Sequence, residues 1–144
     1  SQLGTKDLEP FPESLVLSPE NSREKILSLI TSTKTSLIIY TQTLQDSEIL
    51  SQLDALSANH IDVQVCTAKN EDTASQNTSF LWNRITHMYP HLKVILIDSE
   101  TIFIGSQNLT ANSLDNNREV GIIIRSNTSL FEKLMRIYRE DCLR

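Results

Sequence analysis

The sequence predicts a single α/β domain in which helices flank both faces of a mixed, largely parallel sheet. Its length of 144 residues is that of one domain with a sizeable core. A strand, a helix and a second strand follow one another between residues 36 and 67, an order typical of a parallel βαβ unit. Later strands are apolar on both faces, which indicates a sheet covered by helices on either side.

The first 17 residues contain two prolines and mixed charge, with little periodicity. We interpret residues 1–17 as a linker or as an extended strand leading into the fold, and we assign the domain to residues 18–144. Ser18 precedes Pro19, as a capping serine precedes a proline at the first helical position. A helix is therefore expected over residues 19–33.

Periodicity and turn residues predict the remaining elements. Asp46 or Ser47 is expected to cap a helix that continues through Leu56. The polar tract 69–79 indicates a loop, and Pro90 is expected to end a short helix. We expect strands at 36–41, 61–67, 91–98, 101–108 and 118–125, the short helix at 80–88, and a final helix that covers one sheet face at 129–143.

Composition limits the partners of the chain. The formal net charge of -5 means that the chain lacks the overall positive charge that supplies most non-specific affinity for nucleic acid. No apolar run approaches the roughly 18 residues that a membrane span needs. Cys66 and Cys142 lie far apart in the sequence, and we interpret them as neither a metal pair nor a disulfide framework.

Two features bear on the compartment. The first residues do not resemble a signal peptide, because a charged start followed by an apolar core is missing. Asn77, Asn108 and Asn127 each head an Asn-x-Ser/Thr triplet, but a glycan on Asn108 would block the polar cluster to which this residue belongs. These features favour a cytoplasmic location.

That polar cluster lies in a predicted hairpin. The apolar runs on either side of Ser99-Glu100 indicate a tight turn in which Asp98 pairs with Thr101. In this register the residues that lie opposite each other at the far end of the hairpin project from the same face, since side chains alternate along a strand.

Four polar side chains then converge at one end of the sheet: Lys93 faces Ser106, and His91 faces Asn108. An imidazole can serve as nucleophile or as acid and base, an ammonium neutralises charge, and a hydroxyl and an amide donate hydrogen bonds. These groups suit an oxyanion of phosphorus. His91, Lys93 and Asn108 are therefore the catalytic candidates, and Lys93, Ser106 and Asn108 are expected to bind the substrate.

Two further hairpin residues are predicted to be structural. Asp98 has the opposite parity from His91 and sits at the corner, where aspartate commonly bonds turn amides. Gly105 leaves room for close approach of backbone or substrate, or marks a bulge. Trp82 and Tyr89 precede the hairpin and are assigned to packing rather than to a substrate groove.

The spacing His91-x-Lys93-x4-Asp98-x6-Gly105-Ser106-x-Asn108 resembles the HKD signature of the phospholipase D superfamily. That superfamily includes phospholipases D, cardiolipin synthases, phosphatidylserine synthases and several nucleases. Segments 17–23 and 44–46 are similar to the C-terminal half of bacterial proteins with two HKD motifs, and the resemblance covers about residues 15–143. Segment 117–121 looks like the acidic segment after the motif, which implies that Glu119 orients the histidine.

The resemblance implies a two-step reaction without metal or other cofactor. One histidine attacks phosphorus to give a phosphohistidine, a second protonates the leaving alcohol, and water or another alcohol releases the phosphoryl group. The sequence agrees in having no cluster of metal ligands. Because the family's site combines two HKD motifs and this sequence has one, a second HKD-containing half is expected. It is either a homodimer mate, as in the family's small nucleases, or the N-terminal half of the full-length protein, and the isolated monomer is expected to be inactive.

Three functions remain open. The favoured one is a phospholipase D-like phosphodiesterase or phosphatidyltransferase that acts on a phospholipid. A metal-independent nuclease homodimer of the same superfamily is disfavoured by the negative net charge. A non-catalytic domain that binds a phosphoryl ligand or a protein partner would keep the half-site without turnover.

Overall fold

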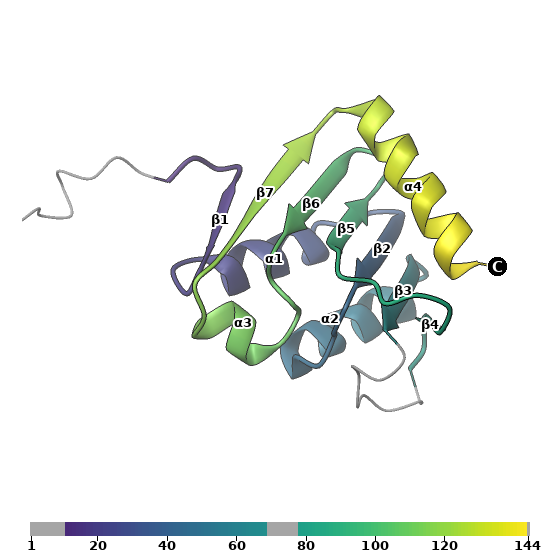
Figure 1. Ribbon diagram of the computed structural model, residues 1–144, viewed down its shortest axis with the longest axis horizontal. Helices are drawn as coiled ribbons and strands as arrows, with labels where there is room; N and C mark the ends of the chain where they lie inside the picture. The colour runs from purple at the N-terminus through teal and green to yellow at the C-terminus, as the bar shows by residue number, and fades with distance from the viewer. Residues whose placement is uncertain (1–10, 69–77, 144) are drawn as a thin grey trace, which may run out of the picture.

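A seven-stranded sheet forms the centre of the computed structural model, which describes residues 11–68 and 78–143 (Figure 1). The predicted loop 69–79 therefore falls almost entirely outside the described residues. The elements are β1 (Leu15–Ser18), α1 (Ser22–Thr31), β2 (Ser36–Thr41), α2 (Ser47–Ala58), β3 (Asp62–Ala68), β4 (Leu81–Ile85), β5 (Lys93–Ile97), β6 (Thr101–Gly105), α3 (Ala111–Asp115), β7 (Glu119–Arg125) and α4 (Thr128–Cys142).

The sheet is mixed, with the strand order β1-β7-β6-β5-β2-β3-β4. The predicted βαβ unit is present, since β2 and β3 pair in parallel across α2, and β4 continues the parallel part. The neighbouring pairs on the other side are all antiparallel. A mixed sheet is thus confirmed, but "largely parallel" overstates its pairing. The short turn between β5 and β6 requires that these two strands be antiparallel, since a parallel pair needs a long crossover.

Helices cover both faces of the sheet, as predicted. On one face the apolar residues of α1 and α2 pack with Leu114 of α3 against the strands, in a core that includes Ile95 and Phe103. On the other face α4 packs through Phe131 and Tyr138 in a second core. Figure 1 shows α4 lying alone on its side of the sheet. Both cores form because β5 alternates two apolar sets, one toward each helical layer.

The N-terminal region differs from the sequence prediction. Ser18 does not cap a helix but ends β1, where it pairs with Glu119 of β7. The first helix begins at Ser22, and the side chain of Asn21 accepts a hydrogen bond from the backbone N–H of Leu17 at 2.8 Å. Residues 15–17 therefore contribute to the sheet, and a turn at residues 19–21 stands in place of the expected first helical turn.

Two segments that the sequence links to two-motif proteins meet in space. Arg23 of α1 pairs with Asp46 at 2.7 Å, and it also contacts Asp115 of α3 at 2.8 Å. Asp46 in turn caps α2, as predicted, by accepting a hydrogen bond from the N–H of Ile49. The ion pairs thus connect all three helices on this face. The short helix α3 has no counterpart among the predicted elements.

The predicted helix at 80–88 is a strand. β4 pairs in parallel with β3, and Asn83 lies opposite Cys66. Trp82 donates a hydrogen bond from Nε1 to Thr67 Oγ1 at 2.8 Å. A short apolar run does not discriminate between helix and strand by periodicity, and here the open edge of β3 determines the outcome.

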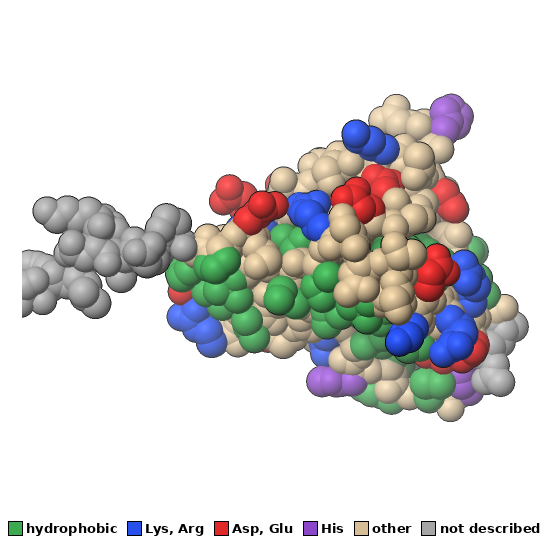
Figure 2. Space-filling model, turned by 90° about the horizontal axis from the view of Figure 1, so that it is seen from above, with side chains coloured by type: hydrophobic (Ala, Val, Ile, Leu, Met, Phe, Trp, Pro, Cys, Tyr) green, Lys and Arg blue, Asp and Glu red, His purple; other side chains and the backbone are tan. Residues whose placement is uncertain are grey.

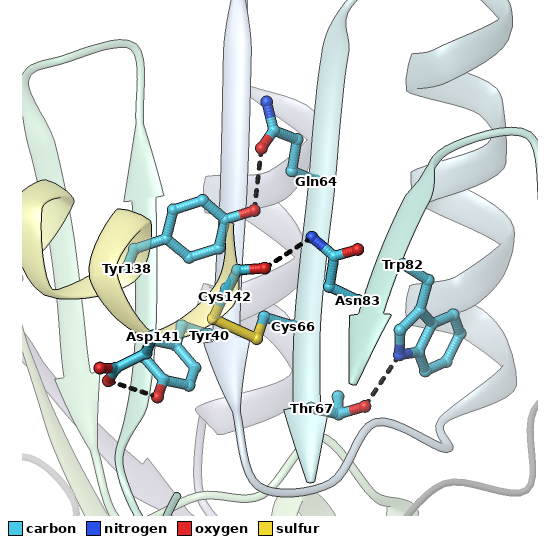
Figure 3. Close-up of a disulfide and its surroundings, with 9 residues drawn as sticks. All are labelled: Tyr40, Gln64, Cys66, Thr67, Trp82, Asn83, Tyr138, Asp141 and Cys142. Carbon is cyan, nitrogen blue, oxygen red and sulfur yellow. Dashed lines mark hydrogen bonds between the residues drawn. A yellow bond between two sulfur atoms is a disulfide. The ribbon is translucent and has the colours of Figure 1, made fainter. Parts of the chain in front are cut away.

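The prediction that the two cysteines form no disulfide was wrong, because Cys66 and Cys142 are bonded to each other (Figure 3). Their Cα atoms are 6.3 Å apart, and the bond joins the last turn of α4 to β3. Tyr138 donates a hydrogen bond to Gln64 Oε1 at 2.8 Å, and Asn83 donates one to the carbonyl of Cys142 at 3.1 Å. The C-terminal end of α4 is therefore attached to the parallel strands by covalent and polar contacts.

One face of the molecule carries exposed apolar surface. Figure 2 shows hydrophobic side chains gathered in a band across the face that lies uppermost in Figure 1. On β7, Val120 and Ile122 are 53% and 46% exposed, whereas the alternate residues Gly121 and Ile123 are buried. Within the described residues, α4 thus leaves part of the β7 surface uncovered.

Candidate active site

The predicted site residues gather at one end of the sheet, where β2 and β6 end and β5 and β7 begin. Thr41, the last residue of β2, pairs with Lys93, the first of β5. Gly105, the last residue of β6, pairs with Gly121 near the start of β7. Antiparallel pairing therefore brings four chain segments to this edge.

The register of the hairpin is one residue away from the prediction. Thr101 pairs with Ile97 rather than with Asp98, and the turn contains three residues, of which Asp98 and Ser99 have positive φ angles of 55° and 59°. Continued to the site, this register sets Lys93 opposite Gly105 rather than Ser106. If side chains alternated strictly, this register would place Lys93 and Ser106 on opposite faces of the sheet. Ser106 lies beyond the end of β6, however, so its side chain need not follow the alternation of that strand.

His91 and Lys93 lie close together, although the predicted strand 91–98 begins only at Lys93 and His91 precedes it. The Lys93 side chain is buried, and its Nζ lies 3.4 Å from His91 Nε2. The ammonium donates hydrogen bonds to the carbonyl oxygen of His91 at 3.0 Å and to Gln42 Oε1 at 3.1 Å. His91 itself is exposed at the rim, so an incoming group can reach the imidazole.

The charge of Lys93 is set by burial and by one carboxylate. Burial lowers the pKa of Lys93, and the negative charge of Glu119 partly opposes that effect. Glu119 shares a sheet face with Gly121 and Ile123, the face on which Lys93 also lies. An ammonium in partly desolvated surroundings interacts strongly with a developing oxyanion, because the local dielectric is low.

Ser106 and Glu119 form a second pair. Ser106 Oγ donates to Glu119 Oε1 at 2.7 Å and accepts from the N–H of Val120 at 3.1 Å. Asn117 donates to the other carboxylate oxygen of Glu119 at 3.3 Å. In the described part of the chain, Glu119 thus binds Ser106 and Asn117 rather than His91, so a direct orienting contact to His91 is absent in this arrangement.

Asn108 occupies a fixed stretch of backbone next to these pairs. The N–H of Leu109 donates to the carbonyl of Thr43, and the carbonyl of Leu109 accepts from Gln45 and Asp46. The side-chain oxygen of Asn108 is buried, and the described residues offer it no hydrogen-bond partner. A buried acceptor with unmet capacity suits a position that meets a hydrogen-bond donor of an incoming ligand or partner.

Asp98 lies at the opposite end of β5. Its carboxylate accepts hydrogen bonds from the backbone N–H groups of Lys34, Thr35 and Ser36 at 2.8 to 3.2 Å. Burial raises the pKa of Asp98, but these N–H groups outweigh burial, and its pKa lies below the ordinary range. The side chain therefore connects the hairpin turn to the segment before β2.

Gly105 is required by close packing. A Cβ at this position would lie 2.9 Å from the Cα of Gly121 and 2.8 Å from Phe103 Cζ, and it would overlap Gln107 Oε1. Gly121 faces the same obstruction from Phe103 and Gln107. The two glycines leave room for the Phe103 ring, which packs over the paired backbones of Gly105 and Gly121.

Two glutamines contribute to the site without having been predicted. Gln107 is fully buried and donates from Nε2 to Ser22 Oγ at 3.0 Å and to the carbonyl of Val16 at 3.3 Å, which anchors the backbone between Ser106 and Asn108. Gln42 follows β2 and contacts Lys93. No local sequence signal distinguishes Gln42 or Gln107, because the residues that they contact come from distant segments of the chain.

The described residues contain no group of three or more His, Cys, Asp or Glu side chains placed to hold a metal ion. Likewise, none of the helices in the described part of the chain has the length and apolar character to span a membrane.

The fold and this half-site together place the chain in the class of phospholipase D-like domains. The sequence profile of the family described as "Cardiolipin synthase, PLD-like domain" matches residues 26–142, and the chain belongs to this family.

Individual relatives agree with this assignment. The chain is 25% identical over 104 residues to the 5'-3' exonuclease PLD3 of Rattus norvegicus, a match that covers 65% of this chain and 21% of that protein. The chain thus spans about a fifth of the length of this curated relative.

Solved structures share the fold. The phospholipase D family member Nuc from Salmonella typhimurium superposes with a TM-score of 0.80 at 24% identity, covering 88% of this chain and 91% of Nuc. NucT from Helicobacter pylori gives a TM-score of 0.76 at 21% identity and covers 90% of this chain and 96% of NucT. The single-domain α/β fold is therefore that of the phospholipase D family.

Proposed function

We propose that this domain supplies one half of a phosphodiesterase or phosphatidyltransferase site, with His91 as its histidine. The observation that carries the proposal is the distance of 3.4 Å between His91 Nε2 and Lys93 Nζ. A phosphorus atom approached by Nε2 would bring one of its oxygens within reach of the ammonium. Nucleophile and charge stabilisation are thus available at one point.

In the proposed reaction His91 Nε2 attacks phosphorus, and an N–P bond forms as the P–O bond to the leaving alcohol breaks. A histidine of the second half donates its proton to the leaving oxygen. That histidine then takes a proton from water or another alcohol, whose oxygen attacks phosphorus and breaks the N–P bond. If His91 instead acts as the acid, the partner's histidine becomes the nucleophile.

The remaining candidates have narrower proposed roles. Lys93 neutralises the phosphoryl oxygens, and Asn108 offers an amide to the bound diester. Ser106 and Glu119 hold each other at 2.7 Å, so Ser106 reaches the substrate only by leaving that carboxylate. Asp98 and Gly105 shape the hairpin. We expect no metal requirement, so activity should survive EDTA.

The second half is proposed because His91 is the one histidine of the HKD motif in this sequence. It is either a second copy of this chain or an HKD-containing half elsewhere in a longer protein. Sedimentation of the protein at several concentrations, combined with activity per mole, tests the first option. Activity confined to the dimer supports a homodimeric site, and an active monomer contradicts the need for a second half.

Any phosphodiester fits the half-site, so the proposed substrate rests on the relatives of the chain. A phospholipid substrate is supported by the family's description as a cardiolipin synthase domain. A nuclease is the second candidate, supported by the curated relative that is named an exonuclease. Parallel assays with phosphatidylglycerol vesicles and with a single-stranded oligonucleotide separate the two.

The test of the chemistry is covalent capture. The protein is incubated with a labelled diester and quenched at alkaline pH, where phosphohistidine survives, and peptides are analysed by mass spectrometry. Label on His91 that is lost in His91→Asn is expected if His91 is the nucleophile, and label on the partner histidine is expected if His91 is the acid. If active protein never carries label on either histidine, the mechanism is wrong; if no diester is turned over at all, a non-catalytic phosphoryl-binding domain is supported instead.

We also propose that the domain folds in an oxidising compartment, in place of the cytoplasmic location favoured by sequence. The support is the disulfide between Cys66 and Cys142, since such bonds are rare in a reducing cytosol. Alkylation of protein trapped from its native cells tests this. Blocked thiols revealed only after reduction are expected, and two freely alkylated cysteines would contradict the proposal.

A further inference from the structure

Gln42 is held at three points next to the catalytic candidates. Its Oε1 accepts from Lys93 Nζ at 3.1 Å, its Nε2 donates to the hydroxyl of Tyr89 at 2.6 Å, and its backbone carbonyl accepts from the N–H of Ala68 at 3.2 Å. Gln42 therefore connects the end of β2, the end of β3 and the segment that leads into the HKD motif.

We propose that Gln42 is a positioning residue that aims the ammonium of Lys93 at the phosphoryl group bound by His91. This inference rests on the proposed function of the half-site. An ammonium has three N–H donors and no acceptor. Two of them are directed to Gln42 Oε1 and to the carbonyl of His91, and the third is left for the side of Nζ that faces His91 Nε2. The phosphoryl oxygen would take that third donor.

The contacts explain why a glutamine suits this position. A carboxylate here would pair with Lys93 and compete with the phosphoryl oxygens for its charge. An apolar side chain would leave the buried ammonium short of an acceptor, which is costly. A neutral amide oxygen holds the ammonium in place and leaves its charge for the substrate.

Tyr89 fixes the orientation of this amide. Because Lys93 only donates, Gln42 must turn its oxygen toward Lys93 and its NH₂ group outward, where the Tyr89 hydroxyl accepts. The Tyr89 side chain is 60% exposed, so its ring is not buried in a core. The expectation that Tyr89 serves only for packing is replaced by a polar role beside the site.

The experiment uses two variants of Gln42 and one matched control. Gln42→Met keeps the length and removes the acceptor, and Gln42→Glu keeps the acceptor and adds a negative charge. Gln64→Met is the control, because Gln64 lies on β3 opposite Ile38 and bonds Tyr138 of α4, not Lys93, through the same Oε1 atom. All variants are first matched for thermal unfolding and for assembly with the second half.

The first readout is the rate of phosphohistidine formation in single turnover. Gln42→Met and Gln42→Glu are expected to slow it roughly tenfold to a hundredfold, as for loss or diversion of a hydrogen bond to a charged group, and Gln64→Met is expected to change it less than twofold. If Gln42→Met is no slower than Gln64→Met while wild type reacts, the positioning role is wrong and the proposed function stands.

The second readout is the titration of Lys93, followed by NMR of ¹³C-labelled lysine. The titratable groups that face Lys93 are the carboxylate of Glu119 and the ring of His91. Gln42→Glu is expected to raise the pKa of Lys93 and Gln42→Met to lower it further, whereas Gln64→Met leaves it unchanged. Unchanged titration in both Gln42 variants overturns the inference. If wild type forms no phosphohistidine with any diester, the proposed function fails independently of this titration.

Discussion

Removal of the disulfide should reduce the stability of the domain by several kcal/mol without altering its folded structure. The perturbation is the double replacement Cys66→Ala/Cys142→Ala. The bond closes a loop with a sequence separation of 76 residues. The chain-entropy relation gives about 4.5 kcal/mol at 25 °C for a loop of that length, all of it from restriction of the unfolded chain.

The folded state should survive because other contacts hold α4. Phe131 and Tyr138 remain buried against the sheet, and Tyr138 keeps its hydrogen bond to Gln64. Asn83 bonds the backbone carbonyl of Cys142, so this contact is independent of the side chain there. A loss of about 4.5 kcal/mol is still a large share of the 5–15 kcal/mol typical of a domain.

The assay is urea unfolding followed by far-UV circular dichroism and by the fluorescence of Trp82. Oxidised wild type, wild type reduced with a phosphine, and the double variant are compared. Reduced wild type and the double variant should lose similar free energy and show unchanged helical signal, with a slightly larger denaturant slope because the unfolded chain is less compact. A loss below about 1 kcal/mol with the helix intact would refute the loop-closure reasoning, and loss of helical signal would refute the claim that α4 stays docked.

Two further predictions concern the hairpin turn and β7, the strand next to the hairpin. The pKa of Asp98 is lowered in the folded state, so ionised Asp98 stabilises the folded domain. This stabilisation is fully present above the unfolded pKa of about 3.9 and is lost as the pH falls through the folded pKa. Asp98→Asn, which tolerates the positive φ, should therefore destabilise the domain at pH 7 by about 1 kcal/mol, and the gap to wild type should close in acid; a gap that persists at pH 2 would contradict this. Gly121→Ala should cost about 1–3 kcal/mol, because the new Cβ would lie 2.6 Å from the Phe103 ring. The double variant with Phe103→Leu should cost less than the sum of the single changes, and strict additivity in urea unfolding would contradict the proposed clash.

Sequence periodicity predicted that His91 and Lys93 lie close together, but neither the start of the strand nor its pairing. The predicted strand 91–98 is observed as Lys93–Ile97, so His91 precedes the strand and its contact with Lys93 does not follow from strand alternation. We predicted that Asp98 pairs with Thr101 across the hairpin, whereas Asp98 adopts a positive φ and accepts hydrogen bonds from backbone N–H groups of a distant segment. The register of a hairpin depends on turn geometry, and a slip of one residue changes every facing pair.

Contacts between distant segments could not be predicted from local pattern. Cys66 lies in a buried strand and Cys142 at a helix end, and their bond depends on α4 crossing β3. Gln42 follows an apolar strand and carries no local sequence signal. It contacts Lys93 because β5 pairs with β2. Each of these contacts is a property of the assembled sheet, whereas helix caps such as Asp46 are local and were predicted.

The place of β5 in the strand order has a consequence for how long the half-site persists. β5 is the fourth of seven strands and is hydrogen-bonded on both sides, to β2 and to β6. Amide hydrogens of such a central strand exchange with solvent mainly through global opening, whereas β1 and β4 at the two edges can open on their own. Lys93, the first residue of β5, therefore belongs to the part of the molecule that is the last to exchange, and fluctuations at the sheet edges leave the strand that carries it intact.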